Sequence, residues 1–465
     1  MNQEKFLERL FTKTNNYLKD IKDSGVVNYT SGSSLFKEIK ADLSIGDQDE
    51  DKIFEEIDTY LKYALKTTHP QFNNQLNAGF VMPALAAEVI SFITNTSMAT
   101  YEIAPIGTIL EQKLSQKLIE LIGFKDGEGI MTTGGSNANM LAIQCARNTH
   151  SSQIKLKGNG EHKFHIYVSD QAHYSFQKSV NIMGLGFESL IKIKSNNGVM
   201  DSKTLESKII ESKKDGFIPL LIASTSGTTV LGSFDDINKN DEIAKKYNVW
   251  HHVDAAWGGP ALFSDELKPL MSGVSKVDSL TWDAHKLMGT GLITSFIILK
   301  DRGQLESANN GGGGKYLFHD YENADYDTGP MSLQCGRKVD SLKLWLAWKY
   351  YGDNGYQKLI DGQLEKAKYL VEKVNEHPRL KLVADREFLN ICFQVIPNKE
   401  VDIDMYNYKL RFHLVKKGES LVNFARFEDG TTFFRYVLTN YATQKRDIDI
   451  FLENLFDAEK TLNLG

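Results

Sequence analysis

Five side chains that can do chemistry follow five separate strand-like segments. Ser136 follows "GIMTT", His173 follows "FHIYVSD", Thr225 ends "IPLLIAST", Asp254 follows "VWHHV", and Lys286 follows "SLTWDA". In an open parallel α/β sheet, ligands bind beyond the carboxyl ends of the strands. We therefore expect these side chains to meet at one edge of a single sheet.

The segment "GGSNANM" supplies one half of a ligand site. Gly134 and Gly135 open a turn, and Ser136 begins a helix-like stretch. Backbone N–H groups at a helix start, together with a hydroxyl, suit a phosphate. The sequence therefore predicts a phosphate-binding turn here, although a plain capped turn would look similar.

One ligand needs the whole set, and it is pyridoxal phosphate. Its aldehyde requires a lysine amine and its ring nitrogen requires an anion, so Lys286 and Asp254 are assigned these parts. His173 is expected to stack on the ring, while Ser136 and His285 hold the phosphate.

Two other classes use some of these residues. His252 and Asp254 lie two apart on a strand, hence on one face, and with His173 they could form a two-histidine, one-carboxylate iron site. That interpretation leaves "GGS" and Lys286 unexplained, so no metal site is predicted. A non-catalytic binding protein would require neither Lys286 nor Asp254.

The elements that must position these residues alternate through the middle of the chain. Apolar strand-like segments are separated by helical patterns such as "SNANMLAIQCARN" and "KNDEIAKKYN", which is typical of an α/β fold with a mostly parallel sheet. From about residue 338, helical stretches precede strand-like ones, which indicates a smaller α+β domain. We predict a dimer-forming helical segment at 1–85, a large cofactor-binding domain at 86–350 and a small domain at 351–465.

Composition excludes several classes of protein. The net charge is −6 and the isoelectric point is near 6.0, whereas a nucleic-acid-binding chain would be basic. No apolar run approaches the roughly 20 residues of a membrane helix. The start of the chain lacks a signal-peptide pattern, and the 3 cysteines are far apart. We expect a cytoplasmic protein with no membrane or nucleic-acid partner.

The chain resembles the group II pyridoxal-phosphate decarboxylases, on the branch of glutamate, cysteine sulfinate and aspartate decarboxylases. The resemblance runs from about residue 69 to the C-terminus, and it implies an aspartate-aminotransferase-like fold (fold type I) and a homodimer with shared active sites. It rests on these segments: "THPQFNNQLNAGF", "ATYEIAPIGTILE", "GGSNANM", "STSGTTVLGSFD", "HVDAAWGG", "TWDAHKLMG", "YDTGPMSLQCGRKVDSLKLWLAWK" and "TTFFRYVLTN".

The resemblance implies further cofactor residues. Lys286 becomes the Schiff-base lysine, Asp254 the ring-nitrogen partner and His173 the stacking residue. The remaining cofactor positions are Gly135, Ser136 and His285 at the phosphate, Thr225 and Ala256 near the ring, and Cys335 and Gly336 reaching the phosphate of the partner subunit.

The resemblance also implies how substrate is bound. Arg435 matches an arginine that grips a substrate carboxylate, and Gln75 and Asn77 match positions beside the substrate. Asn77 stands where glutamate-type enzymes carry a small hydroxyl residue, which favours a shorter acid. Gly107 replaces a bulky aromatic residue and opens space, which favours a longer acid instead. "DAHK" replaces the "NPHK" of the animal branch.

The expected reaction is α-decarboxylation of aspartate, cysteine sulfinate or glutamate. A tyrosine of the loop "FHDYENADYDTG" returns the proton to the α-carbon in this family, and Tyr321 is the first candidate, followed by Tyr326. Decarboxylation of an aromatic or basic amino acid, and transamination on the same fold, stay open as alternatives.

Overall fold

A computed structural model describes residues 2–39, 43, 46 and 49–463. Its contacts divide the chain into two compact units. One unit holds Phe80–Leu364 and Ala384–Asn390, and the other holds the described residues up to Gly79, Glu365–Val383 and the described residues from Ile391 onward. Within the described residues, no helix is both long and apolar enough to cross a bilayer.

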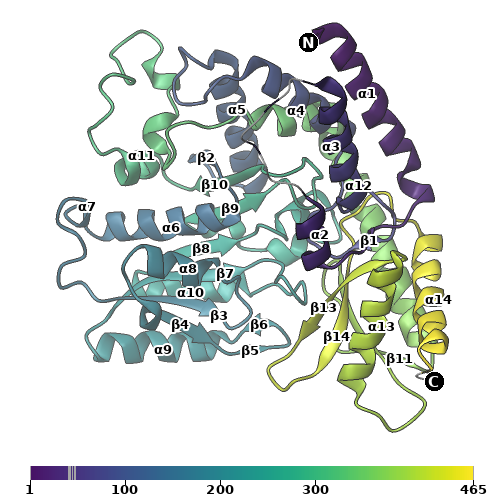
Figure 1. Cartoon of the computed structure of the whole chain (residues 1–465). Coiled ribbons are helices and arrows are strands. Elements are labelled where there is room, and N and C mark those ends of the chain that lie inside the picture. The colour runs from purple at the N-terminus through teal and green to yellow at the C-terminus, as the bar shows by residue number, and fades with distance from the viewer. Residues whose placement is uncertain (1, 40–42, 44–45, 47–48, 464–465) are drawn as a thin grey trace. The chain divides into compact units, whose positions relative to one another are not determined.

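The larger unit is built on a seven-stranded sheet (Figure 1). All neighbouring strands from β9 to β4 run parallel, and only β10 is antiparallel to its neighbours β9 and β2. The prediction of a mostly parallel α/β sheet is confirmed. In spatial order the strands are β2 (Glu128–Thr132), β10 (Ser295–Leu299), β9 (Ser279–Asp283), β8 (Trp250–Asp254), β7 (Ile218–Thr225), β3 (Phe164–Ser169) and β4 (Leu190–Ile193).

Helices cover both faces of this sheet. Alternate residues of a strand point to opposite faces, so Leu221 and Ala223 of β7 join one core cluster while Ile222 joins another. The first cluster includes α6 (Gly135–His150) and α8 (Ser175–Ile182), and the second includes α9 (Ser202–Lys214) and α10 (Ile237–Tyr247). Burial on both faces explains why the strands read as continuous apolar runs.

The remaining elements of the larger unit lie before, between and after the strands. A two-stranded sheet pairs β5 (Ser195–Asn196) with β6 (Val199–Met200). The other helices are α4 (Met82–Thr94), α5 (Pro105–Ile122), α7 (Ile154–Lys157), α11 (Gln304–Asn309) and the first part of α12 (Ser341–Glu376). Helix α12 is interrupted at Gly352, whose φ of +63° is in the left-handed region that glycine adopts without a steric penalty.

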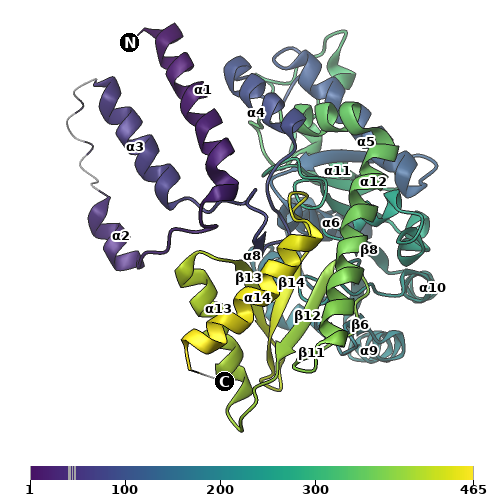
Figure 2. The same ribbon diagram turned by 90° about the vertical axis from the view of Figure 1, so that its right-hand side faces the viewer.

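The smaller unit contains a five-stranded sheet in the order β1-β13-β14-β12-β11 (Figure 2). Its strands are β1 (Phe72–Asn73), β13 (Leu421–Arg426), β14 (Thr432–Val437), β12 (Asn390–Val395) and β11 (Leu380–Leu382). Its helices are α1 (Gln3–Asp20), α2 (Gly32–Glu38), α3 (Glu50–Tyr63), α13 (Ile403–Lys417) and α14 (Lys445–Thr461), together with the end of α12.

The N-terminal residues and the C-terminal sheet belong to the same unit. Phe72 and Asn73 pair with Leu421 and Val422 in parallel register, and the Asn440 amide donates to the carbonyl of His69 at 2.7 Å. This grouping differs from the separate segments expected at 1–85 and 351–465, because backbone pairing between distant segments has no local sequence signal. That residues 1–85 help to form a dimer stays a prediction.

Candidate active site

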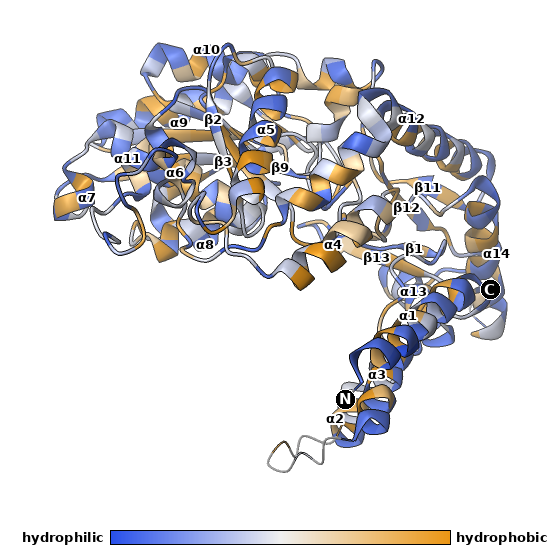
Figure 3. Cartoon of the chain, turned by 90° about the horizontal axis from the view of Figure 1, so that it is seen from above, coloured by the Kyte–Doolittle hydropathy of each residue, from blue (hydrophilic) through white to orange (hydrophobic). Residues whose placement is uncertain are grey.

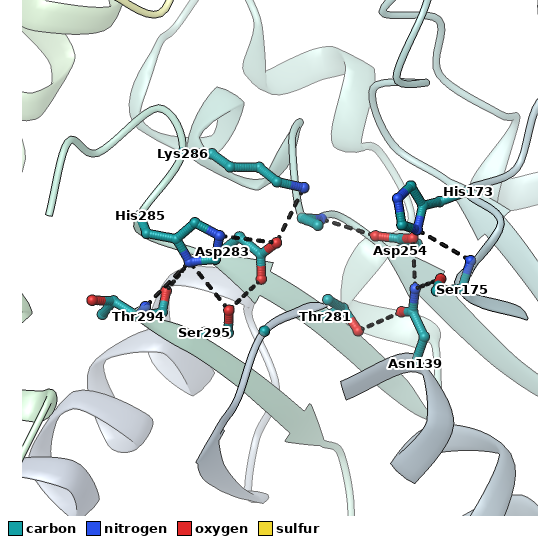
Figure 4. Close-up of polar contacts among 12 residues, drawn as sticks. Asn139, His173, Ser175, Asp254, Thr281, Asp283, His285, Lys286, Thr294 and Ser295 are labelled. Carbon is teal, nitrogen blue, oxygen red and sulfur yellow. Dashed lines mark hydrogen bonds and ion pairs between the residues drawn. The ribbon is translucent and has the colours of Figure 1, made fainter. Parts of the chain in front are cut away.

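Several of the predicted residues of the larger unit lie at the carboxyl edge of the parallel strands. Thr225, Asp254 and Asp283 are the last residues of β7, β8 and β9. Lys286 follows in the turn after β9, where its backbone N–H donates to the carbonyl of Asp283 at 3.1 Å. Figure 4 shows Lys286, Asp283, Asp254 and His173 around one region above the strand ends.

The turn before α6 has the geometry expected of an anion-binding helix start. Gly134 has a φ of +114°, which only glycine adopts readily, and α6 begins at Gly135. Ser136 is exposed in the first turn. The first backbone N–H groups of a helix have no partner within it, so this turn can hold a phosphate with the Ser136 hydroxyl beside it.

Lys286 lies against a buried carboxylate. The amine Nζ is 3.1 Å from Asp283 Oδ2, and His285 Nε2 is 3.7 Å from the same oxygen. Ser295 Oγ donates to Asp283 Oδ1 at 2.6 Å, and the backbone N–H of Thr294 donates to His285 Nδ1 at 3.2 Å. Burial raises the pKa of Asp283, but attraction to Lys286 and His285 and the Ser295 bond outweigh it and leave that pKa below its usual range.

The hydrogen bonds to Asp254 come from neutral donors. Asn139 Nδ2 donates to its Oδ2 at 2.8 Å, and the backbone N–H of Ala256 donates to its Oδ1 at 3.1 Å. The Asn139 carbonyl in turn accepts from Thr281 Oγ1 at 2.7 Å and lies 3.0 Å from His252 Nε2. Because donors occupy the carbonyl side, the amide must turn its NH₂ group towards Asp254.

The two neighbouring histidines are neutral for a common reason. Burial lowers the pKa of His252 to about 3, and burial likewise lowers the pKa of His173. The His173 Nδ1 accepts the backbone N–H of Ser175 at 3.2 Å, which leaves a neutral ring that can stack on another ring.

The iron-site alternative loses support from the same contacts. His252 Nδ1 lies 2.8 Å from Ser279 Oγ, so both ring nitrogens are engaged by protein groups and neither is available to a metal. Over the residues that the structure describes, His, Cys, Asp and Glu side chains form no group of three suited to a metal ion.

The residues present fit pyridoxal phosphate. Thr225 Oγ1 is buried and has no hydrogen-bond partner among the described residues, and an orphaned buried hydroxyl at a strand end suits a group supplied by a ligand. A lysine amine, a carboxylate held by neutral donors, a neutral imidazole and a helix start then match the aldehyde, ring nitrogen, ring face and phosphate of this cofactor.

The loop tyrosines occupy a different neighbourhood. Tyr321 Oη donates to Asp327 Oδ1 at 2.7 Å, and the same oxygen accepts the backbone N–H of Tyr101 at 2.7 Å. Desolvation and then the bond to Asp327 raise the pKa of Tyr321 to about 12. The Tyr326 ring lies 5.6 Å from that of Tyr101. In this arrangement the Tyr321 hydroxyl is committed to Asp327, and its role as the proton donor stays a prediction.

The predicted substrate residues lie in the smaller unit. Arg435 on β14 is 5% exposed and donates to the carbonyl of Asn74 at 2.8 Å. Thr439 Oγ1 donates to the carbonyl of Gln75 at 3.0 Å, while Asn77 is partly buried two residues further on. Burial lowers the pKa of Arg435. Within this unit, the contacts bring Arg435 next to the segment that carries Gln75 and Asn77.

Sequence reasoning missed the residues that hold the predicted ones. Asn139 lies one helical turn after Ser136, so its spacing places it on the same side of α6. Asp283 is three residues before Lys286, in the very segment that departs from the animal branch. Both spacings can be read from the sequence, but neither shows that Asn139 bonds to Asp254 or that Asp283 lies against Lys286. Cys335 and Gly336 are exposed, and their role across an interface stays a prediction.

Comparison with known proteins supplies the family. Residues 33–396 match the family described as pyridoxal-dependent decarboxylase conserved domain. The chain is 36% identical over 430 residues to the human protein named cysteine sulfinic acid decarboxylase, covering 89% of this chain and 87% of that one. Mouse CSAD is similar in structure, with a TM-score of 0.93 at 32% identity over 98% of this chain and 99% of that chain. Rice TDC, solved with PLP and tryptamine, has a TM-score of 0.92 at 21% identity over 99% and 98% of the two chains, a likeness of fold alone.

Proposed function

Because the chain belongs to the pyridoxal-dependent decarboxylase family, we propose that it removes the α-carboxyl group of an acidic amino acid as carbon dioxide. Cysteine sulfinate, aspartate and glutamate are the candidate substrates. The observation that carries the proposal is the 36% identity to the human cysteine sulfinic acid decarboxylase across 89% of this chain. The protein is a carboxy-lyase that depends on pyridoxal phosphate.

The residues at the strand ends have separate roles in the proposed reaction. When bound, pyridoxal phosphate supplies an aldehyde that links to an amine and a ring that accepts electrons as a bond at the α-carbon breaks. Lys286 provides the amine in the absence of substrate. Asp254 keeps a proton on the ring nitrogen, because its charge faces no cation among its hydrogen-bond donors, Asn139 and Ala256. The neutral ring of His173 would stack on the ring face of the cofactor.

Selection of an acidic substrate is assigned to Arg435. A guanidinium meets a carboxylate or a sulfinate as a planar fork of donors. Arg435 is 5% exposed, and an anion from the substrate offsets the cost of burying a cation better than an aromatic or basic side chain does. Asn77 favours the two shorter acids over glutamate, because a larger amide leaves less room for an additional methylene group.

We also propose that the active form is a homodimer in the cytoplasm. Helix α4 carries apolar side chains on its outer surface, and Figure 3 shows its hydrophobic colouring. Met82 is 63% exposed, Phe92 78% and Ile93 70%, and exposed apolar patches of this kind mark interaction sites. A partner subunit would cover this patch and bring its own Cys335 and Gly336 to the phosphate, as the resemblance implies. Sedimentation of a fully active monomer would contradict this part of the proposal.

The test is a carbon dioxide release assay on cysteine sulfinate, aspartate, glutamate, tyrosine and 2,4-diaminobutyrate. We expect the three acids to exceed tyrosine and diaminobutyrate by a wide margin in kcat/KM, with the shorter acids ahead. Arg435→Ala should lose at least about tenfold on the acids, since loss of one partner from a shielded charge pair costs about 2–5 kcal/mol.

Arg411→Ala is the matched control for that variant. Arg411 belongs to the same unit, is partly buried and donates to a backbone carbonyl, that of Val422, at 3.2 Å, so the control removes a comparable guanidinium and leaves Arg435 in place. Tyrosine or diaminobutyrate as the best substrate would overturn the proposal. Product keto acid in place of carbon dioxide would favour an aminotransferase.

A further inference from the structure

We propose that Asp283 is a positioning residue for Lys286: its carboxylate holds the lysine side chain as a cation above the strand ends and thereby sets the pH range over which the chain takes up its cofactor. The inference rests on the proposed dependence on pyridoxal phosphate and adds a residue that controls how the lysine becomes available to it.

The position of Asp283 is fixed by the sheet. It ends β9 and pairs in register with Ser295 of β10, whose hydroxyl donates to Oδ1 at 2.6 Å. The other oxygen, Oδ2, is left to face the turn, where Lys286 Nζ lies 3.1 Å away. The Asp283 side chain is 3% exposed. The carboxylate is therefore a rigid partner for a flexible amine.

Charge balance requires the amine to be the partner. A carboxylate buried to this degree needs a compensating cation or several donors. Both basic groups near Oδ2 attract the carboxylate, Lys286 more strongly than His285, and burial lowers the pKa of His285, so Lys286 is the principal cationic partner. In Figure 4 the two groups converge on Asp283 from the turn, while Ser295 approaches from β10.

Other charged groups act on the pair from a greater distance. Asp254 and His173 interact electrostatically with each other and lie near Lys286, and Lys178 of α8 contributes to the same field. Lys343 of α12 acts on His285. From α6, Gly135 lies against the Asp283 carboxylate and contributes no charge. None of these groups replaces the contact at 3.1 Å.

Asp283 also reaches the predicted phosphate turn. A Cβ atom added to Gly135 would lie 2.7 Å from Asp283 Oδ2, which is closer than real Cβ contacts. The carboxylate thus lies between the lysine amine and the start of α6. Its charge is therefore close both to the amine and to the predicted phosphate turn.

The contact with Asp283 bears on the proton that Lys286 must lose before it links to the cofactor. Linkage to an aldehyde joins the lysine nitrogen to the carbonyl carbon and releases one water, and the nitrogen can attack only after the ammonium has given up a proton to solvent. A neighbouring carboxylate favours the ammonium form. Removing the charge of Asp283 should therefore allow rapid uptake at lower pH.

The experiment follows uptake of pyridoxal phosphate by the full-length, cofactor-stripped chain in the absence of substrate. Stopped-flow absorbance at the wavelength of the lysine-linked cofactor gives a rate at each pH, and borohydride reduction followed by mass spectrometry confirms linkage at Lys286. Asp283→Asn, which keeps the shape and removes the charge, should move the pH of half-maximal uptake rate down by about 1–3 units.

Two further variants make the result decisive. Asp278→Asn is the matched control, because Asp278 precedes the same strand and accepts the backbone N–H of His251 at 2.7 Å, away from Lys286; its profile should match wild type. Asp283→Glu keeps the charge and should keep the midpoint closer to wild type than Asp283→Asn does. A wild-type midpoint in Asp283→Asn, or equal shifts in the Asn and Glu variants, would overturn the inference.

Folding is checked by circular dichroism before each titration. If Asp283→Asn does not fold, Asp283→Ala takes its place with the same expected direction. Because no amino acid substrate is present, a wrong substrate assignment leaves this experiment unaffected, whereas absence of any linked cofactor in the wild-type chain would contradict the proposed function itself.

Discussion

Two buried aspartates end adjacent strands of one sheet, yet their surroundings differ in kind. Asp254 on β8 receives an amide and a backbone N–H, both neutral. Asp283 on β9 receives one neutral hydroxyl and faces a lysine amine at 3.1 Å. Both are at most 5% exposed, so burial does not distinguish them.

The difference lies in where each negative charge is used. Neutral donors orient a carboxylate and stabilise it without cancelling its charge, so Asp254 can still attract a protonated ring nitrogen. The charge of Asp283 is already balanced inside the protein, so it acts on Lys286 and not on a ligand. Identical residues at equivalent strand ends thus serve a cofactor in one case and a protein side chain in the other.

Removing Lys286, the cation that faces Asp283, should cause the largest loss of activity. Lys286→Ala takes away both the linked amine and the partner of Asp283, so we expect turnover to fall by about 10²–10⁴-fold, the range of a lost acid–base group. Borohydride reduction and mass spectrometry should find no cofactor attached to the chain. Retention of substantial decarboxylation together with a reducible linkage elsewhere would show that another lysine serves.

Removing the negative charge of Asp254, which no cation in the protein balances by a hydrogen bond among the described residues, should cause the next largest loss of activity. Asp254→Asn keeps the shape but lets the ring nitrogen lose its proton, and we expect kcat to fall by about 10²–10³-fold, as for other electrostatic groups. Cofactor content, measured after alkaline release, should fall much less. The same substitution at Asp283 should instead move the pH profile of uptake. If the two variants behave alike, the distinction drawn between the carboxylates is wrong.

Removing a hydrogen bond that orients Asp254 should reduce kcat less than removing the Asp254 charge does. Asn139→Ala removes a charge-assisted hydrogen bond of 2.8 Å, which is worth about 1.5–3 kcal/mol, so kcat should fall at least about tenfold. Thr281→Val is the control, because it removes the 2.7 Å bond on the carbonyl side of the same amide, together with a 3.3 Å contact to His252 Nε2, and no bond to Asp254. A control with the larger loss would mean that Thr281, not Asn139, orients the carboxylate.

The smallest effect concerns His252 and acid stability. Its pKa is about 3 in the folded chain against an ordinary value of 6.5, so the unfolded chain binds the extra proton first as pH falls. Stability is therefore complete above about pH 6.5 and decreases by about 1.4 kcal/mol per unit as pH falls from there towards 3. One unit below 6.5, urea titration should show His252→Gln losing about 1 kcal/mol less than wild type, while His319→Gln, at an exposed position, should behave as wild type.

Much of the site could be predicted because strand ends are visible in a sequence. Parallel strands bring their carboxyl ends to one edge, so identifying the residue after each apolar run was enough to place Thr225, Asp254 and Lys286 together. The glycine pair before α6 was equally readable, because Gly134 requires a backbone that other residues avoid.

What could not be predicted is the set of contacts that turns these residues into a site. Asn139 serves Asp254 because its amide is oriented by Thr281 and His252, two side chains more than a hundred residues away in the chain. The attachment of β1 to β13 is likewise a pairing of remote segments. Hydrogen-bond direction and strand partnership depend on three-dimensional neighbours, which periodicity and spacing do not contain.

The three cysteines have different accessibilities, and this has a practical outcome. Cys145 and Cys392 are buried, and burial raises the pKa of both thiols, whereas Cys335 is exposed. Thiol-specific reagents act on the thiolate and need access, so a maleimide dye should attach at a single position of the unmodified chain. Cys335 is adjacent to Gly336, in the segment expected to face a partner subunit, and fluorescence from that dye would report association of subunits without any engineered residue.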